Sequence, residues 1–380
     1  MLESGAMRTI DVIIVGAGVM GAAAACEVAG QGSRVALIDQ STLPNPRAAS
    51  VDHSKVFRFA YPDPFYVTLA VDALKRWRGL EEEMSTQLLT QTGALLIGKH
   101  QPSFETECYE ALRSLSLEAE LLTSEQAVSR FPQFNAEKFS FGVYDPSGAI
   151  LHAEAALRLL IDLARRRGVE MIERERVISI RQDSASRVLL ITESGEELTG
   201  ERAIIASGPW SRKLLPVLAD KLTTTRQEIV YFEPADRASF EPGRFPIFIE
   251  LESGFYGFPI HHAGVIKIAN HHKGVQVDPS SEDLVGDEFI ESCRAFFGEF
   301  IPALRDARVR ETRVCIYNNT PDDDFIIDWH PRLENVLIVT GFSGHGFKFA
   351  ATIGRIAADL LLSRYTPYNI ERFSLARFGA

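Results

Sequence analysis

The chain has few cysteines, and their spacing excludes the common cysteine-based sites. Four are spread through 380 residues, with no CxxC pair and no metal-ligand cluster beside the nine histidines. Structural zinc centres need ligands at short, paired spacings, and disulfide-stapled domains need many cysteines in a short chain. We therefore predict free thiols, no metal site, and a reducing, cytoplasmic location.

Positive charge is also in deficit. There are 40 lysines and arginines against 51 acidic residues, which gives a formal net charge of −11. Nucleic acids and anionic membrane surfaces attract proteins through an excess of basic residues. We expect neither as a partner, and an anionic small molecule would have to meet a local cluster of cations.

A signal peptide and a membrane span are not predicted either. Residues 11–30 are about as apolar as a membrane span, but Asp11, Glu27 and the patterned glycines indicate a buried strand, turn and helix. No basic segment with a cleavage site precedes them. Met1 and Met7 are both compatible with a natural start.

Patterns for several other chemistries are missing. The sequence contains no Ser-His-Asp order, zinc motif, paired-carboxylate pattern, internal repeat or low-complexity tract. Three adjacent acids at residues 322–324 cannot all face one ion, so we interpret them as a solvated turn.

The length favours two domains, and the hydrophobic fraction of 46% is ample for their cores. An apolar strand, an alanine-rich helix and a second strand open the chain as one βαβ unit of a parallel sheet. A second block has a helix, a strand, an antiparallel pair and an apolar strand, and a third has a strand and a helix. The expected elements of these blocks are 11–15, 21–29, 34–38, 153–166, 170–172, 177–182, 187–192, 203–206, 336–340 and 352–362.

Short segments rich in aromatic and branched residues lie between these blocks. They suggest a second, mostly antiparallel sheet inserted into the first domain. These segments are 94–98, 140–144, 228–233, 247–250, 256–258 and 265–269.

A dinucleotide-binding fingerprint connects the first strand to the first helix. It reads Gly16-Ala17-Gly18-Val19-Met20-Gly21, and Asp39 ends the next strand eighteen residues after Gly21. The first glycine permits a tight turn, the second admits a pyrophosphate, and the third lets the helix pack on the strand. Asp39 can accept ribose hydroxyls. The motif by itself does not separate FAD from NAD.

Two further glycine turns follow predicted strands. One is Ser207-Gly208-Pro209-Trp210, and the other is the segment 341–349, with three glycines and Lys348. Glycines let the backbone approach a flat ligand closely, and a lysine adds a cation. Taken alone, the second segment favours a strand followed by a flexible turn.

Together with Cys315, these motifs resemble the flavin-dependent sarcosine oxidase family of amine oxidases over nearly the full length. Cys315 begins a Cys-x-Tyr run, five residues before Thr320-Pro321-Asp322. The family includes N-methyltryptophan, pipecolate, fructosyl amino acid and saccharopine oxidases. The resemblance implies FAD as cofactor, and it implies that Cys315 carries the flavin through a thioether at the 8α carbon. That bond requires a thiolate at the edge of the ring. The other cysteines are expected to be small buried hydrophobes.

The resemblance also assigns roles in the run from Asp52 to Tyr61. Arg58 matches an arginine that binds the substrate carboxylate, Tyr61 a nearby tyrosine, and Ser54 a threonine. Lys55 stands where sarcosine oxidases have arginine. Because lysine is a flexible point charge and arginine a rigid fork, this difference argues against sarcosine itself and for bulkier N-substituted amino acids.

Lys267 interrupts an otherwise apolar strand. If it faces inward it needs an anion, a water or a function, although alternation alone would also allow it to face solvent. The matching lysine in the family assists the reaction with oxygen. His271, Tyr256, Tyr317 and His345 match site residues, whereas neighbouring histidines at 261, 262 and 272 are expected on surface loops. Lys348 and Arg58 would together bind a carboxylate.

The resemblance implies that the cofactor contacts come mainly from the glycine turns and their flanks. They are Gly16, Gly18, Val19, Met20, Gly21, Asp39, Gln40, Ser54, Lys55, Val177, Ser207, Gly208, Trp210, Cys315, Gly344, His345, Gly346, Phe347 and Lys348.

We therefore predict an α/β protein with a Rossmann-like FAD-binding domain and an interleaved, mostly antiparallel β-sheet substrate domain. The first is expected over 8–90, 151–225 and 320–380, and the second over 91–150 and 226–319. The implied reaction is hydride transfer from an N-substituted amino acid to flavin N5, hydrolysis of the imine, and reduction of O2 to H2O2 by a monomer. Two alternatives stay open: a dehydrogenase that passes electrons to a quinone or carrier, and a non-catalytic flavin-binding subunit.

Overall fold

The computed structural model describes residues 10–184, 187–281 and 284–379. The first two residues of the predicted FAD domain, 8 and 9, and the alternative start at Met7 lie outside them.

The chain forms two compact units, each built from separate stretches of sequence. Unit 1 comprises Met1–Val51, Glu154–Thr224 and Tyr317–Ala380. Unit 2 comprises Asp52–Ala153 and Thr225–Ile316. Both units are therefore discontinuous, as the alternation of sequence blocks predicts.

Unit 1 is organised around a sheet in the order β10-β11-β12-β1-β2-β9, with β19 and β18 joined to β12. Strands β12, β1, β2 and the edge strand β9 pair in parallel in that order, and β19 also pairs in parallel with β12. β1 and β2 are continuous apolar runs because a parallel strand covered on both faces has no solvent side. The strands are β1 (Ile10–Val15), β2 (Val35–Asp39), β9 (Glu170–Glu173), β10 (Val177–Ser184), β11 (Arg187–Thr192), β12 (Glu197–Ile205), β18 (Ile326–Trp329) and β19 (Val336–Thr340).

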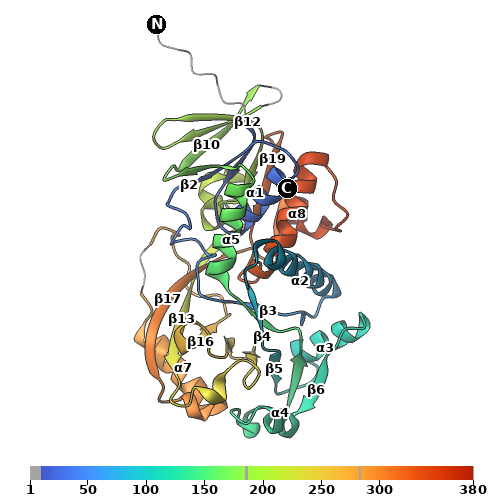
Figure 1. Cartoon of the computed structure of the whole chain (residues 1–380), viewed down its shortest axis with the longest axis vertical. Coiled ribbons are helices and arrows are strands. Elements are labelled where there is room, and N and C mark those ends of the chain that lie inside the picture. Colours follow the sequence, from blue (N-terminus) through green and yellow to red (C-terminus); the bar gives the residue numbers. More distant parts are fainter. Residues whose placement is uncertain (1–9, 185–186, 282–283, 380) are drawn as a thin grey trace. The chain divides into compact units, whose positions relative to one another are not determined.

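Helices α1 (Val19–Gly30) and α8 (Ala350–Ser363) lie side by side in unit 1 (Figure 1). Small residues allow this contact: a Cβ added to Gly354 would lie 2.7 Å from the carbonyl carbon of Ala23. Within the described residues, unit 1 has two further α-helices, α5 (Ala153–Arg166) and the short α6 (Ser211–Leu214).

Unit 2 contains a sheet in the order β17-β13-β16-β15-β14-β5-β7-β6. Of the described pairs from β13 to β6, only β14 and β5 run in parallel, so this sheet is mostly antiparallel, as predicted. The strands are β5 (Ala94–Gly98), β6 (Glu120–Thr123), β7 (Phe141–Asp145), β13 (Thr223–Glu233), β14 (Ile247–Glu250), β15 (Phe255–Gly257), β16 (Ile266–Asn270) and β17 (Arg308–Asn319).

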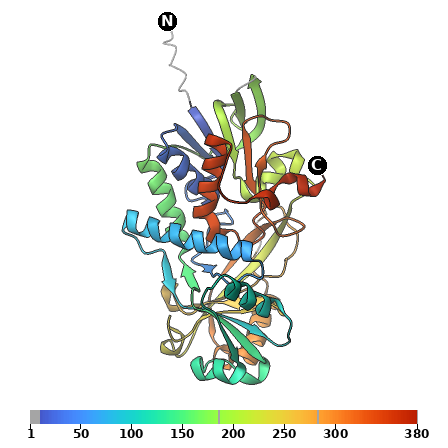
Figure 2. The ribbon, with the colours of Figure 1, turned by 90° about the vertical axis from the view of Figure 1, so that its right-hand side faces the viewer.

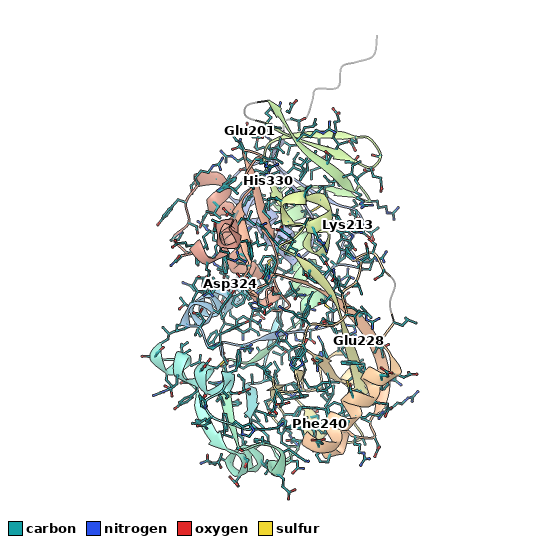
Figure 3. All side chains as sticks on the ribbon, turned by 180° about the vertical axis from the view of Figure 1, so that it is seen from behind. Glu201, Lys213, Glu228, Phe240, Asp324 and His330 are labelled. Carbon is teal, nitrogen blue, oxygen red and sulfur yellow. The ribbon has the colours of Figure 1, made fainter. Side chains whose placement is uncertain are left out.

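A phenylalanine-rich core packs against this sheet. Phe296 stacks on Phe248 and, one helical turn along, on Phe300. Phe240, which is labelled in Figure 3, meets the ring of Phe245 edge-on. The stack of Phe296 on Phe248 brings α7 (Asp287–Phe300) against β14. Each such pair adds roughly 0.5–1.5 kcal/mol to the stabilisation from burial.

Five of the described α-helices were not predicted from the sequence. They are α2 (Pro64–Met84), α3 (Phe104–Ser114), α4 (Ser124–Arg130), α6 and α7. Capping marks the starts of the first three: Asp63 accepts the N–H of Phe65, and Ser103 and Thr123 form capping boxes. Figure 2 shows α2 as one unbroken helix.

Residues 52–90 were expected in the FAD-binding domain, but they belong to unit 2. β3 (Lys55–Phe57) and β4 (Leu89–Gln91) both pair with β8 (Ala149–Leu151) in a small antiparallel sheet. This pairing attaches the segment to the stretch that ends at residue 153.

The acidic turn at residues 322–324 has Asp322 and Asp323 exposed, and two of its acids form ion pairs. Arg377 donates to Asp322 at 2.8 Å, and Arg372 donates to Asp324 (labelled in Figure 3) at 3.0 Å. The turn is therefore solvated, as the sequence predicts, and the structure adds two ion pairs to the C-terminal segment.

The contact between α1 and α8 gives a test of packing. Gly354→Ala should lower the free energy of unfolding by about 1–3 kcal/mol, because the added methyl group meets backbone that cannot move aside cheaply. Gly79→Ala in α2 is the matched control, since its Cβ would meet no atom within 4 Å. That change should stabilise the protein by roughly 0.5–1 kcal/mol. Denaturant unfolding of both variants checks the prediction, and equal effects would contradict it.

Candidate functional site

The fingerprint turn in unit 1 is built on close backbone contact. Gly16 has φ +99°, and a Cβ there would lie 2.5 Å from the carbonyl oxygen of Ala206. A Cβ on Gly21 would lie 1.8 Å from the oxygen of Gly16. Only glycine fits either position, so β1, the turn and α1 pack as the fingerprint requires.

Asp39 is hydrogen-bonded to the same turn. Its Oδ2 accepts the N–H of Ala17 at 2.8 Å, while Oδ1 accepts the N–H of Ser41 and the side-chain amide of Asn45. Burial raises the pKa of Asp39. A carboxylate has about four acceptor positions, so this one retains capacity for a ribose hydroxyl.

Gly18 leaves space at the start of α1. A Cβ at Gly18 would meet only Ser50 Oγ, at 3.3 Å, and this hydroxyl accepts the N–H of Val19. The helix N-terminus therefore offers backbone amides beside an open position.

The two other glycine turns also lie in unit 1. Gly208 has φ +50°, and a Cβ on Gly344, with φ +76°, would lie 2.2 Å from the ring of Tyr317. Lys348 is buried and donates to the carbonyl oxygen of His345 at 2.8 Å. Asn318 joins these turns, because its side-chain amide donates to the oxygen of Gly208 and to Thr340.

Unit 1 therefore holds most of the residues predicted to contact the cofactor. They are Gly16, Gly18, Val19, Met20, Gly21, Asp39, Gln40, Val177, Ser207, Gly208, Trp210, Gly344, His345, Gly346, Phe347 and Lys348. Tyr317, predicted as a substrate-site residue, also lies in unit 1. The remaining predicted residues lie in unit 2: Ser54, Lys55, Arg58, Tyr61, Tyr256, Lys267, His271 and Cys315.

Lys267 in unit 2 faces inward and is 1% exposed, which decides between the two orientations left open by the sequence. Its Nζ donates to Asp52 Oδ2 at 2.6 Å and to the carbonyl oxygen of Ser54 at 2.7 Å. Burial lowers the pKa of Lys267 to about 8, and the Asp52 carboxylate opposes that shift. The same ion pair, together with Lys55, holds the pKa of Asp52 well below its usual range.

Lys55 lies between Asp52 and Cys315. Its Nζ is 3.3 Å from Asp52 Oδ2 and 3.6 Å from Cys315 Sγ. A cation therefore faces the thiol that the resemblance assigns to the flavin.

Arg58 is sandwiched between aromatic rings. Its guanidinium carbon lies 4.3 Å from the ring centre of Tyr61 and 5.8 Å from that of Phe104. Arg58 Nη1 and Ser54 Oγ are buried and have no hydrogen-bond partner in the described part of the chain. Burying unsatisfied polar atoms is costly, so both positions suit contact with a polar ligand.

Three residues near Lys267 were missed by sequence reasoning. The hydroxyl of Tyr231 donates a hydrogen bond to Asp52. In the sequence, Asp52 belongs to a polar run that suggested no separate role for it. His261 was expected on a surface loop, but its Nε2 is buried and its ring packs on Phe258. Asp52 and Tyr231 are 179 residues apart, so spacing gives no signal of their contact.

The other loop histidines are more exposed. His272 is exposed, as expected, and exposed His262 stacks on His53 with ring centres 3.6 Å apart. His271 is exposed as well, and its ring lies edge-on to that of Tyr256 at 6.5 Å.

Comparisons with known proteins identify the family of the chain. The model of the DAO family, described as FAD dependent oxidoreductase, matches residues 11–360. The chain belongs to this family. It is 31% identical to peroxisomal sarcosine oxidase of Homo sapiens, over 97% of this chain and 96% of the relative. It is 33% identical, with the same coverage, to monomeric sarcosine oxidase of Bacillus sp. (strain B-0618).

Solved structures share the fold of this FAD-dependent oxidoreductase. L-proline dehydrogenase from P. horikoshii has a TM-score of 0.86 at 21% identity, covering 98% of this chain and 99% of that one. Glycine oxidase from Geobacillus kaustophilus has a TM-score of 0.82 at 22% identity, covering 97% and 98%. The predicted α/β fold class and the resemblance to the sarcosine oxidase family are confirmed.

The nucleotide turn fits FAD. The open side of Gly18, the amides at the start of α1 and the free acceptor capacity of Asp39 suit a pyrophosphate and a ribose. In the described segments no group of three or more His, Cys, Asp or Glu residues is arranged to hold a metal ion. Among the described helices, none combines the length and apolar character needed to cross a membrane.

Gly18→Ala separates cofactor binding from folding. The added methyl group would enter the space beside the helix N-terminus but would touch only Ser50 within the protein. FAD affinity should therefore fall by roughly tenfold or more, equivalent to about 1.4 kcal/mol, while the unfolding transition of the apoprotein changes little. Titration of apoprotein with FAD and thermal melting provide the two measurements. Unchanged FAD affinity would show that the pyrophosphate does not approach this glycine.

Proposed function

We propose that the chain is an oxidase of N-substituted amino acids that acts on the secondary amine and uses O2 as acceptor. The observation that carries the proposal is the full-length similarity to two sarcosine oxidases at 31% and 33% identity. Bound FAD would supply the two-electron oxidation of the carbon–nitrogen bond and the reduction of O2 to H2O2. The protein would supply binding, orientation and charge.

Arg58 is proposed to bind the substrate carboxylate. Its Nη1 is buried and lacks a partner within the described residues, and the rings of Tyr61 and Phe104 hold the guanidinium in place. A charge-assisted bond from this position would orient the substrate. The predicted contribution of Lys348 remains part of the proposal.

Lys267 is proposed to stabilise negative charge that develops on oxygen. A buried cation is effective in this role because few waters screen it. Its burial at 1% exposure favours the oxidase over the dehydrogenase alternative.

The substrate is proposed to carry an N-substituent bulkier than methyl. Lys55 replaces an arginine of sarcosine oxidases, and its ammonium is bound close to Asp52. A compact ammonium held in this way leaves more room than a guanidinium.

Cys315 is proposed to carry the flavin covalently. Lys55 Nζ lies 3.6 Å from its sulfur, where it can hold negative charge while the thioether forms. The name of the Bacillus relative supports a monomer. The four free cysteines support the predicted reducing, cytoplasmic location.

Substrate oxidation tests the proposal directly. Without oxygen, N-substituted amino acids should bleach the flavin, and admission of air should return the colour with release of H2O2. Bleaching without peroxide, reversed by a quinone, would support the dehydrogenase. No bleaching by any amine would support a flavin-binding subunit.

The role of Arg58 can be tested with pairs of acids and their decarboxylated amines. Arg58→Ala should weaken binding of the acids by roughly 2–5 kcal/mol, the cost of removing one partner of a buried charged contact. Binding of the amines should change little, because they lack the carboxylate. Arg78→Ala, on the outer face of α2 with a side chain 44% exposed, is the control. If wild-type enzyme oxidises amines as well as acids, the carboxylate model is wrong.

Covalent attachment predicts that acid precipitation leaves the yellow colour in the protein pellet. Cys315→Ser should release all flavin to the supernatant, because serine does not form the thioether. Cys293→Ala, in the phenylalanine core, should keep the yellow pellet. A colourless pellet from fully loaded wild-type enzyme would refute the attachment.

A further inference from the structure

Asp52 is the centre of a buried hydrogen-bond cluster in unit 2. Its Oδ1 accepts the hydroxyl of Tyr231 at 2.5 Å and the backbone N–H of His53 at 2.8 Å. Its Oδ2 accepts Lys267 Nζ at 2.6 Å and lies 3.3 Å from Lys55 Nζ. At 1% exposure, this carboxylate is fully enclosed by donors from four positions.

These hydrogen bonds determine how many N–H donors of Lys267 remain for a ligand. An ammonium has three N–H donors. Within the described residues, one is given to Asp52 and one to the carbonyl oxygen of Ser54, so a single donor remains for a ligand. Phe258 lies against the ammonium, with its ring centre 4.8 Å from Nζ. Because two bonds fix the orientation of the group, the third N–H has one direction.

We propose that Asp52 is a positioning residue for the oxygen reaction: its carboxylate keeps Lys267 charged and aims the remaining N–H at the ligand. The inference rests on the proposed function, because the role of Lys267 with oxygen belongs to it. Asp52 itself touches neither substrate nor cofactor in this scheme. It acts through Lys267.

Charge balance in the cluster supports this role. Two lysines share one carboxylate, so the cluster carries an excess positive charge beside the Cys315 sulfur. Burial favours neutral Lys267, and the nearby Lys55 also lowers its pKa. Asp52 is the main group that opposes both effects.

Other charged and titratable groups surround the cluster. Tyr231 is protonated, since burial and Asp52 raise its pKa. His261 is neutral, with a pKa lowered by burial to about 4. Next to His53, Glu311 is paired with Arg313. With Tyr231 and His261 uncharged and Glu311 already paired, Asp52 is the carboxylate in direct contact with Lys267.

The pH dependence follows from this arrangement. The pKa of Lys267 is lowered to about 8, so the charged form and its help with oxygen are lost as the pH rises through that value. Asp52→Asn removes the opposing charge, and the loss should therefore occur at lower pH. At a pH above both titration midpoints, a midpoint that is lower by about one pH unit leaves roughly one tenth of the protonated Lys267.

The experiment follows the Lys267 ammonium itself. FAD-loaded enzyme labelled with lysine ε-¹³C is titrated by NMR, and the Lys267 signal is assigned by its absence in Lys267→Met. In Asp52→Asn the titration midpoint should fall by about one pH unit or more. Flavin reoxidation by O2, measured by stopped flow at high pH, should slow roughly tenfold, with flavin reduction by substrate much less affected.

Two further variants separate charge from packing. Lys55→Met removes the competing cation, so the Lys267 midpoint should rise, and this NMR result tests the inference even if Asp52→Asn does not fold. Tyr231→Phe keeps the ring and leaves both bonds of Lys267 in place, so its midpoint should not fall. A fall in Tyr231→Phe equal to that in Asp52→Asn would mean that any disturbance of the cluster has this effect, and would overturn the inference.

The inference and the proposed function fail in different ways. If Lys267→Met reoxidises as fast as wild type, the proposed oxygen role of Lys267 is wrong, whatever Asp52 does. If Lys267→Met is slow but Asp52→Asn keeps the wild-type midpoint and rate, the positioning role of Asp52 is wrong and the role of Lys267 stands.

Discussion

A charge buried in a protein has to be compensated by a partner, and the site in unit 2 depends on the compensation of Lys267 by Asp52. Replacing such a pair with apolar residues is often neutral or stabilising, whereas removing one partner costs about 3–5 kcal/mol. Stability alone therefore does not explain why an ammonium and a carboxylate, each 1% exposed, occupy the interior of this unit. The proposed role of Lys267 gives a reason, because a buried cation that keeps one N–H without a partner among the described residues can stabilise charge on a ligand.

Unit 1 depends on a different constraint, the close approach of backbone to backbone. Gly16 and Gly21 bring β1 and α1 together, and Gly354 brings α8 against α1. The same absence of side chains leaves the start of α1 open at Gly18. The same small residues thus serve both helix packing and cofactor binding. This explains why the motif can be identified from the sequence alone.

The parts of the molecule predicted from sequence are those whose partners are near in the chain. The fingerprint needs only strand, turn, helix and Asp39 in order, and the structure has them in that order. Asp52 and Lys267 are 215 residues apart, and no periodicity connects them. The same limit applies to residues 52–90, which pair with a strand near residue 150 and so belong to unit 2.

The lysine at position 55 is better understood once Asp52 is considered with it. Asp52 Oδ2 accepts Lys267 and has Lys55 Nζ 3.3 Å away, while Oδ1 is used by Tyr231 and His53. An arginine at position 55 would present a planar fork that binds both oxygens of a carboxylate at once. Such a fork would compete with Tyr231 and Lys267 for Asp52. A compact ammonium shares one oxygen and leaves the other bonds intact, so a lysine at 55 is the cation compatible with an acid that also orients Lys267.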